Sequence, residues 1–229
     1  MTPPSISSPP RAILFDAYGT LFDVYSVGAL AERLFPGHGE RLTQLWRDKQ
    51  IEYSHLSSMS RRYRPFWDLT LAGLRYAAVR LKLELSDSAQ AALMNQYLQL
   101  SPFPENLDVL QALRQRRVRA GILSNGDPDM LSAVVDRAGF GGLLDPLLSA
   151  QSVQRFKTDD AVYTLGPQAL RMAAGDILFV SSNCWDAVGA TWFGYTTLWV
   201  DRAGLPLEAL DTTPTRIGSS LRDVLTFFD

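Results

Sequence analysis

The sequence predicts an α/β protein in which helices flank a parallel β-sheet and a separate helical segment interrupts the chain near its start. Short apolar runs, each long enough for one buried strand, recur along the chain. Helical stretches separate these runs in the second half, and this alternation is typical of a parallel sheet. Residues 24–101 differ, because they show helical periodicity and almost no strand pattern.

The first strand is expected at residues 12–15, where Ala-Ile-Leu-Phe forms an uninterrupted apolar run. Such a run is typical of a strand that is buried on both faces. Asp16 and Gly19 follow it, as expected where a strand ends in a turn. The later strands are expected at residues 120–123, 177–180 and 196–200, with helices near residues 104–116, 128–138, 159–173 and 185–193.

The inserted segment carries apolar side chains at helical spacing. They are Leu42, Leu45 and Trp46 in one stretch and Phe66, Trp67, Leu71, Leu74 and Leu81 in another. Because the insert lies between the first strand and the rest of the sheet, we expect it to cover the carboxyl ends of the strands. The predicted organisation is a core domain of residues 11–23 and 102–229 and a helical cap domain of residues 24–101.

The composition argues against several classes of partner. Lys and Arg total 22 against 24 Asp and Glu, so the net charge of −2 gives no bias toward nucleic acid or an anionic membrane. No uncharged apolar run reaches the ~20 residues that span a bilayer. Cys184 is the single cysteine, and with only His38 and His55 beside it a zinc site is not expected. We therefore expect a cytoplasmic protein.

Polar residues follow the predicted strands. They are Asp16, then Ser124 and Asn125, then Ser181 and Asn183. In open α/β sheets, ligands bind beyond the carboxyl ends of the strands. Capping of the next helix is the alternative role, and we expect it for Asp127, which precedes Pro128. Asp16 favours function, because it places a charge directly after a fully apolar strand and beside a turn.

Four motifs occur in a characteristic order. They are Asp16-Ala-Tyr-Gly-Thr-Leu-Phe-Asp-Val24, Ser124-Asn125-Gly126, Lys157, and Ser181-Ser-Asn-Cys-Trp-Asp186. In these motifs the chain resembles the haloacid dehalogenase superfamily, and within it the L-2-haloacid dehalogenases, over essentially everything after the first ten residues. The resemblance implies a Rossmann-like parallel sheet core with an inserted α-helical cap domain.

The residue at position 18 distinguishes the dehalogenases from the phosphatases of the superfamily. Superfamily phosphatases that use magnesium have a second Asp two residues after the nucleophile, and this sequence has Tyr18 there. A tyrosine supplies no carboxylic acid, and Mg²⁺ prefers carboxylate ligands. The resemblance therefore implies dehalogenation of short (S)-2-haloalkanoic acids to (R)-2-hydroxy acids through an aspartyl ester, with no metal or organic cofactor. A magnesium-dependent small-molecule phosphatase and a non-catalytic carboxylate-binding protein on the same scaffold stay open as alternatives.

The resemblance also implies roles for residues at the strand ends. Asp16 is implied to be the nucleophile that attacks the carbon bearing the halogen, while Thr20 and Lys157 orient it. Ser181 and Asp186 are implied to tether Lys157 and to help orient the water that hydrolyses the ester.

Further residues are implied to hold the substrate. Ser124 and Asn125, with backbone N–H groups of the turn after the first strand, are implied to bind the substrate carboxylate. Arg47, which the residues alone predict to be an exposed arginine of a cap helix, is implied to bind the leaving halide together with Asn183. The other implied site residues are Tyr163, whose hydroxyl supports the site, and Tyr18, Ile51, Phe66 and Trp185, which line the substrate pocket. A homodimer joined through the cap helices is implied as well.

Overall fold

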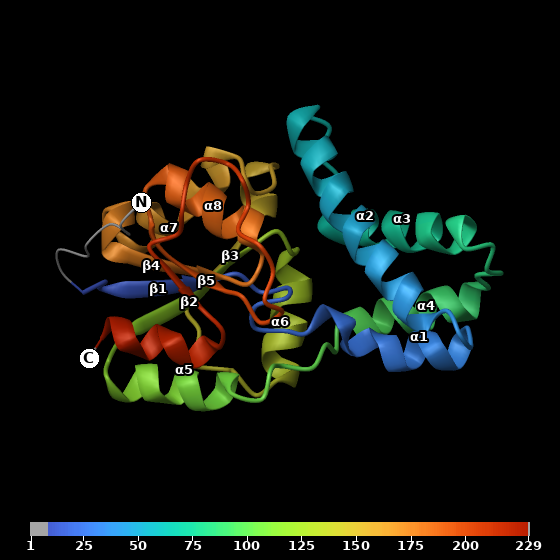
Figure 1. The fold of residues 1–229 in the computed structure, drawn as a ribbon, viewed down its shortest axis with the longest axis horizontal. Coiled ribbons are helices and arrows are strands. Elements are labelled where there is room, and N and C mark those ends of the chain that lie inside the picture. The colour runs from blue at the N-terminus through green and yellow to red at the C-terminus, as the bar shows by residue number, and fades with distance from the viewer. Residues whose placement is uncertain (1–8, 229) are drawn as a thin grey trace.

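A six-stranded parallel sheet forms the centre of the protein, and the computed structural model describes residues 9–228 (Figure 1). The strands are β1 (Ala12–Phe15), β2 (Arg119–Ser124), β3 (Leu147–Ser149), β4 (Ile177–Ser181), β5 (Thr196–Val200) and β6 (Arg216–Gly218). Their order across the sheet is β3-β2-β1-β4-β5-β6, and every neighbouring pair is parallel. The predicted α/β class is confirmed.

Helices cover the sheet. They are α5 (Asn106–Gln115), α6 (Pro128–Arg137), α7 (Asp160–Leu170) and α8 (Cys184–Phe193), with short 3-10 helices at Val24–Val27, Ala150–Val153, Ala174–Asp176 and Leu221–Phe227. Figure 1 shows α7 and α8 on one side of the sheet and α5 on the other. This arrangement buries β1 and β4 on both faces, which explains why both strands are wholly apolar up to their last residues.

The strand register gathers distant polar residues at one edge of the sheet. Phe15, the last residue of β1, lies opposite Ile122 of β2 and Val180 of β4. The residues that follow in the chain therefore emerge together, and Asp16 N donates to the carbonyl oxygen of Val180 at 2.9 Å.

Residues between β1 and α5 form a separate group of helices. They are α1 (Gly28–Leu34), α2 (Gly39–Met59), α3 (Phe66–Arg80) and α4 (Asp87–Tyr97). Figure 1 shows the four helices together beyond one end of the sheet. The indole Nε1 of Trp46 in α2 donates to the carbonyl oxygen of Thr70 in α3 at 2.7 Å. Gly73 of α3 lies so close to α2 that a Cβ there would stand 3.2 Å from the Trp46 carbonyl oxygen.

Two strands were not predicted. Both β3 and β6 have three residues, and both carry exposed or half-buried side chains instead of a continuous apolar run. The core helices begin and end within a few residues of their predicted limits. Among residues 9–228, the structure contains no helix with the length and apolar character needed to cross a membrane.

Candidate active site

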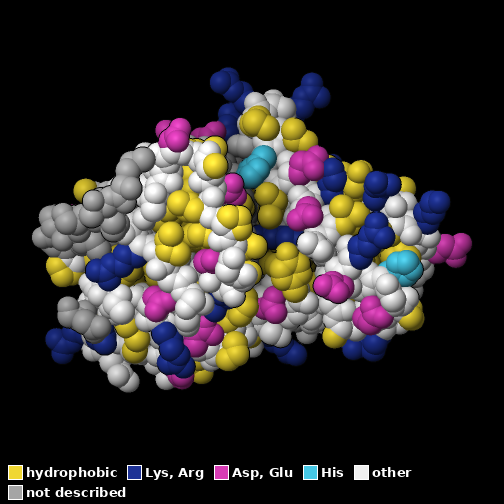
Figure 2. Space-filling model, viewed as in Figure 1, with side chains coloured by type: hydrophobic (Ala, Val, Ile, Leu, Met, Phe, Trp, Pro, Cys, Tyr) yellow, Lys and Arg dark blue, Asp and Glu magenta, His cyan; other side chains and the backbone are white. Residues whose placement is uncertain are grey.

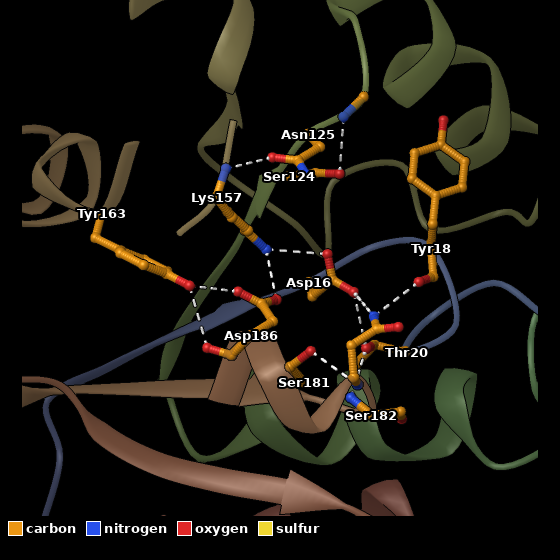
Figure 3. Close-up of polar contacts among 12 residues, drawn as sticks. Asp16, Tyr18, Thr20, Ser124, Asn125, Lys157, Tyr163, Ser181, Ser182 and Asp186 are labelled. Carbon is orange, nitrogen blue, oxygen red and sulfur yellow. Dashed lines mark hydrogen bonds and ion pairs between the residues drawn. The ribbon is translucent and has the colours of Figure 1, made fainter. Parts of the chain in front are cut away.

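Three ionisable side chains meet at the carboxyl end of the sheet (Figure 3). Lys157 Nζ lies 3.0 Å from Asp16 Oδ1 and 2.8 Å from Asp186 Oδ2. Lys157 and Asp186 are completely buried, and Asp16 is 6% exposed. One ammonium group therefore bridges two carboxylates that are almost wholly removed from water.

Burial and charge act on these groups in opposite directions. Burial raises the pKa of Asp186 to about 6, although the Lys157 ammonium and the Tyr163 hydroxyl both lower it. Burial alone would lower the pKa of Lys157, but Asp16 and Asp186 outweigh it, so the net direction is upward. The amine therefore stays charged at neutral pH. Tyr163 Oη donates to Asp186 Oδ1 at 2.8 Å, and burial raises the pKa of Tyr163 well above its usual range.

Both oxygens of Asp16 are held. Lys157 contacts Oδ1, while Thr20 Oγ1 and Asn183 Nδ2 donate to Oδ2 at 3.1 and 2.9 Å. Thr20 is itself fixed, because its Oγ1 accepts from the backbone N–H of Ser182 at 2.8 Å. A buried carboxylate with an imposed orientation is suited to nucleophilic attack, since little reorganisation is needed to reach a substrate.

Arg47 reaches this group from α2. Its Nη2 donates to the Tyr18 carbonyl oxygen at 3.0 Å and to Asn183 Oδ1 at 3.2 Å. Arg47 is 8% exposed, so the prediction of an exposed arginine from the residues alone is wrong. The α2–α3 helix pair lies over the strand ends and turns this side chain inward. Arg47, Asn183 and Ile51 line a cavity of about 330 Å³ beside the turn at Gly19.

The molecule is also hollowed on the side of Lys157. Figure 2 shows a hollow between the sheet and the helical insert, with Lys or Arg side-chain atoms at its floor. A cavity of about 360 Å³ there is lined by residues of α2, including His55 and Ser58, and by Lys157 and Thr158. This cavity therefore reaches the residues around Lys157, while the Lys157 side chain itself stays buried.

Gln50 was not predicted as a site residue, yet it is completely buried and holds Arg47. Its Oε1 accepts from Arg47 Nη1 at 2.7 Å and from the Tyr97 hydroxyl at 2.9 Å. Its Nε2 donates to Thr70 Oγ1 at 2.6 Å, and that hydroxyl donates to the Phe66 carbonyl oxygen at 2.8 Å. Because the Thr70 hydrogen is used, Thr70 must accept from Gln50, which turns the amide oxygen toward Arg47. The available signal was a polar residue three positions after Arg47, on the same helix face.

Ser124 and Asn125 shape the loop that follows β2. Ser124 Oγ accepts from the backbone N–H of Gly126 at 3.1 Å, and Asn125 Oδ1 accepts from the backbone N–H of Lys157 at 2.9 Å. Asn125 is thus joined to Lys157, whose Nζ contacts Asp16 (Figure 3). With its oxygen engaged, Asn125 has its Nδ2 as the group able to donate to a ligand.

Ser181 and Asp127 have partners other than those expected. Ser181 was expected to tether Lys157, but its Oγ accepts from the backbone N–H of Asn183 at 3.1 Å, because it ends β4 at the first turn of the following loop. Asp127 does stand at the N-terminus of α6, but its side chain makes no cap there. Its carboxylate instead accepts from backbone N–H groups at the start of α3.

The predicted pocket residues lie at separate positions. Ile51 lines the cavity beside Arg47. Phe66 is buried and packs against Tyr18, with ring centroids 5.6 Å apart. Trp185 meets His55 edge to face at 4.9 Å, at the other side of the site. The apolar surroundings therefore consist of several separate contacts around the site.

Comparison with known proteins places this arrangement in a family. The family model for haloacid dehalogenase-like hydrolases matches residues 10–194, which include every residue of the site described above. The chain belongs to this family. Its resemblance to the superfamily, first inferred from the four motifs, is confirmed.

Relatives within the family are similar over nearly their whole length. An (S)-2-haloacid dehalogenase of Pseudomonas sp. (strain YL) is 44% identical, over 96% of this chain and 94% of that protein. Haloacetate dehalogenase H-2 of Moraxella sp. (strain B) is 41% identical, over 89% of this chain and 91% of that protein.

Solved structures in the family have the same fold. The crystal structure of the L-2-haloacid dehalogenase RSc1362 matches with a TM-score of 0.94 and 53% identity, over 96% of this chain and 99% of that one. The L-2-haloacid dehalogenase from Xanthobacter autotrophicus with chloropropionic acid covalently bound matches with a TM-score of 0.89 and 35% identity, over 96% and 98%.

Proposed function

We propose that this protein hydrolyses short (S)-2-haloalkanoic acids to (R)-2-hydroxy acids through an ester of Asp16. The observation that carries the proposal is the state of that carboxylate. It is buried, fixed through both oxygens, and adjacent to a cavity where Arg47 supplies a positive charge. The similarity to proteins named (S)-2-haloacid dehalogenase supports the same activity.

In the first step, an Asp16 oxygen attacks the carbon that bears the halogen, from the side opposite the halogen. A C–O bond forms as the carbon–halogen bond breaks, and the electron pair leaves with the halide, so the carbon is inverted. Arg47 and the Asn183 amide lie where they can stabilise the departing anion, whose charge is larger in the transition state than in the substrate. Ser124 and the Asn125 Nδ2 are proposed to hold the substrate carboxylate.

In the second step, water attacks the carbonyl carbon of the ester. The bond between that carbon and the ester oxygen attached to substrate C2 breaks. The hydroxy acid leaves with this oxygen, and the Asp16 carboxylate forms again with release of one proton. Lys157 stabilises negative charge on the Asp16 oxygens during this step. Asp186 binds the same Lys157 ammonium group and is proposed to orient the water.

The phosphatase alternative fits these residues less well. A superfamily phosphatase needs a cation and a general acid near the nucleophile. Here Tyr18 replaces the second Asp, and residues 9–228 contain no group of three or more His, Cys, Asp or Glu side chains that could hold a metal ion. The residues present do not fit a magnesium ion. Burying a carboxylate costs free energy, and a non-catalytic protein would gain nothing from fixing Asp16 in this way.

We also propose that the protein is a cytoplasmic homodimer with a cap domain of residues 24–101. The single cysteine, Cys184, suits a reducing compartment. Support for the dimer comes from apolar side chains that α2 and α3 leave exposed. They are Leu56, Met59, Tyr76 and Val79, of which Val79 is 79% exposed.

A halide-release assay tests the proposed activity. Purified protein is incubated with chloroacetate, with each enantiomer of 2-chloropropionate, and separately with p-nitrophenyl phosphate and Mg²⁺. We expect chloride from chloroacetate and from the (S) enantiomer, unchanged after dialysis against EDTA. Phosphate release that requires Mg²⁺, without any halide release, would support the phosphatase instead. Binding of 2-chloropropionate without turnover would support the non-catalytic alternative.

A further inference from the structure

A carboxylate of the core caps a helix of the insert. Asp127 Oδ1 accepts from the backbone N–H of Phe66 at 2.9 Å, and its Oδ2 accepts from that of Trp67 at 2.8 Å. Phe66 and Trp67 are the first two residues of α3. Asp127 is 8% exposed, and its hydrogen bond to Phe66 is buried while the one to Trp67 is partly buried.

The start of α3 lacks a cap of its own. The first N–H groups of a helix have no partner within it and carry a partial positive charge. The preceding residue is Pro65, which makes no side-chain hydrogen bond there. The carboxylate that fills this role comes from a residue 60 positions later in the chain. Formation of this cap therefore requires α3 to lie against the core.

The loop that carries Asp127 also contacts the site. Asn125 holds the backbone of Lys157. Gly126 lies against the Tyr18 ring, where a Cβ would stand 2.6 Å from Tyr18 Cε2. The residues proposed to bind the substrate carboxylate and the residue that holds α3 thus belong to one short segment.

The first turn of α3 contacts the site in two ways, through the Phe66 ring and through the hydrogen bonds that end at Arg47. Phe66, whose backbone N–H is capped by Asp127, packs its ring against Tyr18. The Phe66 carbonyl oxygen accepts from Thr70, which orients Gln50 and through it Arg47. A displacement of the start of α3 would therefore move both an apolar wall and the guanidinium.

We propose that Asp127 is a positioning residue that docks α3 on the core and thereby sets the place of Phe66 and Arg47. The effect on catalysis rests on the proposed function. Phe66 is one of the pocket residues that the family resemblance implies, so we infer that Asp127 also contributes to the preference for substrates with an alkyl group at C2 over chloroacetate.

The first test measures docking without any substrate. Amide hydrogen exchange of Phe66 and Trp67 is followed by NMR in the wild type, Asp127→Ala and Asp127→Asn. We expect Asp127→Ala to speed exchange at both amides by at least about tenfold, since each loses a charge-assisted hydrogen bond. Asp127→Asn keeps one acceptor oxygen, so we expect one of the two amides to stay more protected. Unchanged exchange in Asp127→Ala would overturn the proposal.

The second test separates positioning from ordinary stabilisation. Ser86→Ala is the matched control, because the Ser86 side chain caps α4 within the insert through Ala89 N and touches no site residue. In Asp127→Ala we expect kcat/KM to fall by roughly tenfold or more for (S)-2-chloropropionate and by less for chloroacetate. We expect the ratio between the two substrates to stay at the wild-type value in Ser86→Ala. Equal losses for both substrates in Asp127→Ala would overturn the effect on preference.

The two proposals fail in different ways. If the wild type releases no halide, the proposed function fails, while amide exchange still decides whether Asp127 docks α3. If the wild type is active and amide exchange is unchanged in Asp127→Ala, only the docking proposal fails.

Discussion

Asp186 shares the buried Lys157 amine with Asp16, and its environment makes it sensitive to pH. Burial raises its pKa to about 6, partly offset by Lys157 and by the Tyr163 hydroxyl. The ionised form of Asp186, which helps to hold the Lys157 ammonium, therefore predominates above pH 6 and is lost below it. We expect kcat/KM to fall as the pH drops through about 6.

Tyr163→Phe tests whether Asp186 causes the fall in kcat/KM at low pH. The variant removes a donor that lowers the pKa of Asp186, so the fall in kcat/KM should move to higher pH. The measurement is the pH profile of kcat/KM for both proteins. If kcat/KM of the variant falls at the same pH as in the wild type, or at a lower pH, Asp186 does not cause the fall.

Arg47 contributes its charge at the point where halide would leave. Arg47→Ala should lower kcat by roughly 10²-fold or more, because the lost interaction is stronger in the transition state. Arg41→Ala is the matched control, since Arg41 is an exposed arginine of the same helix. We expect its kcat to stay near the wild-type value in the halide-release assay. A similar kcat for the two variants would remove Arg47 from the chemistry.

At the scale of the elements, the close contact between α2 and α3 fixes the Gln50 and Arg47 network. Gly73 allows that contact, because a Cβ at this position would already stand 3.2 Å from the Trp46 carbonyl oxygen. Gly73→Val should lower the free energy of unfolding by ~1–3 kcal/mol, as expected when atoms are added to a close-packed contact. Urea denaturation measures this loss, and Gly73→Ala should show a smaller one. Equal stability of all three proteins would mean that α2 and α3 separate easily.

The strands were predictable to the extent that burial marks them. The buried parts of β1, β2, β4 and β5 are mostly apolar, because neighbouring helices cover both faces of the sheet there. The edge strands β3 and β6 have three residues each and are partly exposed, so they lack that pattern. Their positions depend on pairing with β2 and β5, which no local pattern reveals.

The site was predictable where motifs mark it and not where it depends on packing between distant helices. Asp16, Thr20, Lys157, Asn183 and Asp186 follow strands or belong to motifs, and the strand register brings them together. A glutamine within a helix is ordinarily exposed, so the spacing of Gln50 from Arg47 did not indicate that α3 and α4 would bury it.

Asp127 shows the same limit. Its position before Pro128 correctly indicated the start of α6, but the direction of its carboxylate depends on where the inserted helices dock. That docking depends on contacts between segments about 60 residues apart, which a local pattern does not contain.

At the scale of the whole molecule, the exposed apolar side chains of α2 and α3 predict a dimer. Val79→Lys should lower the mass measured by sedimentation equilibrium from that of two chains to that of one, because it places a charge in the proposed contact. Trp192→Lys is the control, since Trp192 is a 57% exposed side chain of the core helix α8. A dimer that persists in Val79→Lys and dissociates in Trp192→Lys would place the contact on the core.

The fate of oxygen in a single turnover tests the covalent role of Asp16 most directly. Enzyme in excess converts (S)-2-chloropropionate in H₂¹⁸O, and mass spectrometry follows both the lactate and the peptide that contains Asp16. If Asp16 attacks the substrate, the lactate oxygen comes from the enzyme, so the lactate is largely unlabelled and the peptide gains one ¹⁸O. Labelled lactate together with an unlabelled Asp16 peptide would contradict this mechanism and make Asp16 a base that activates water.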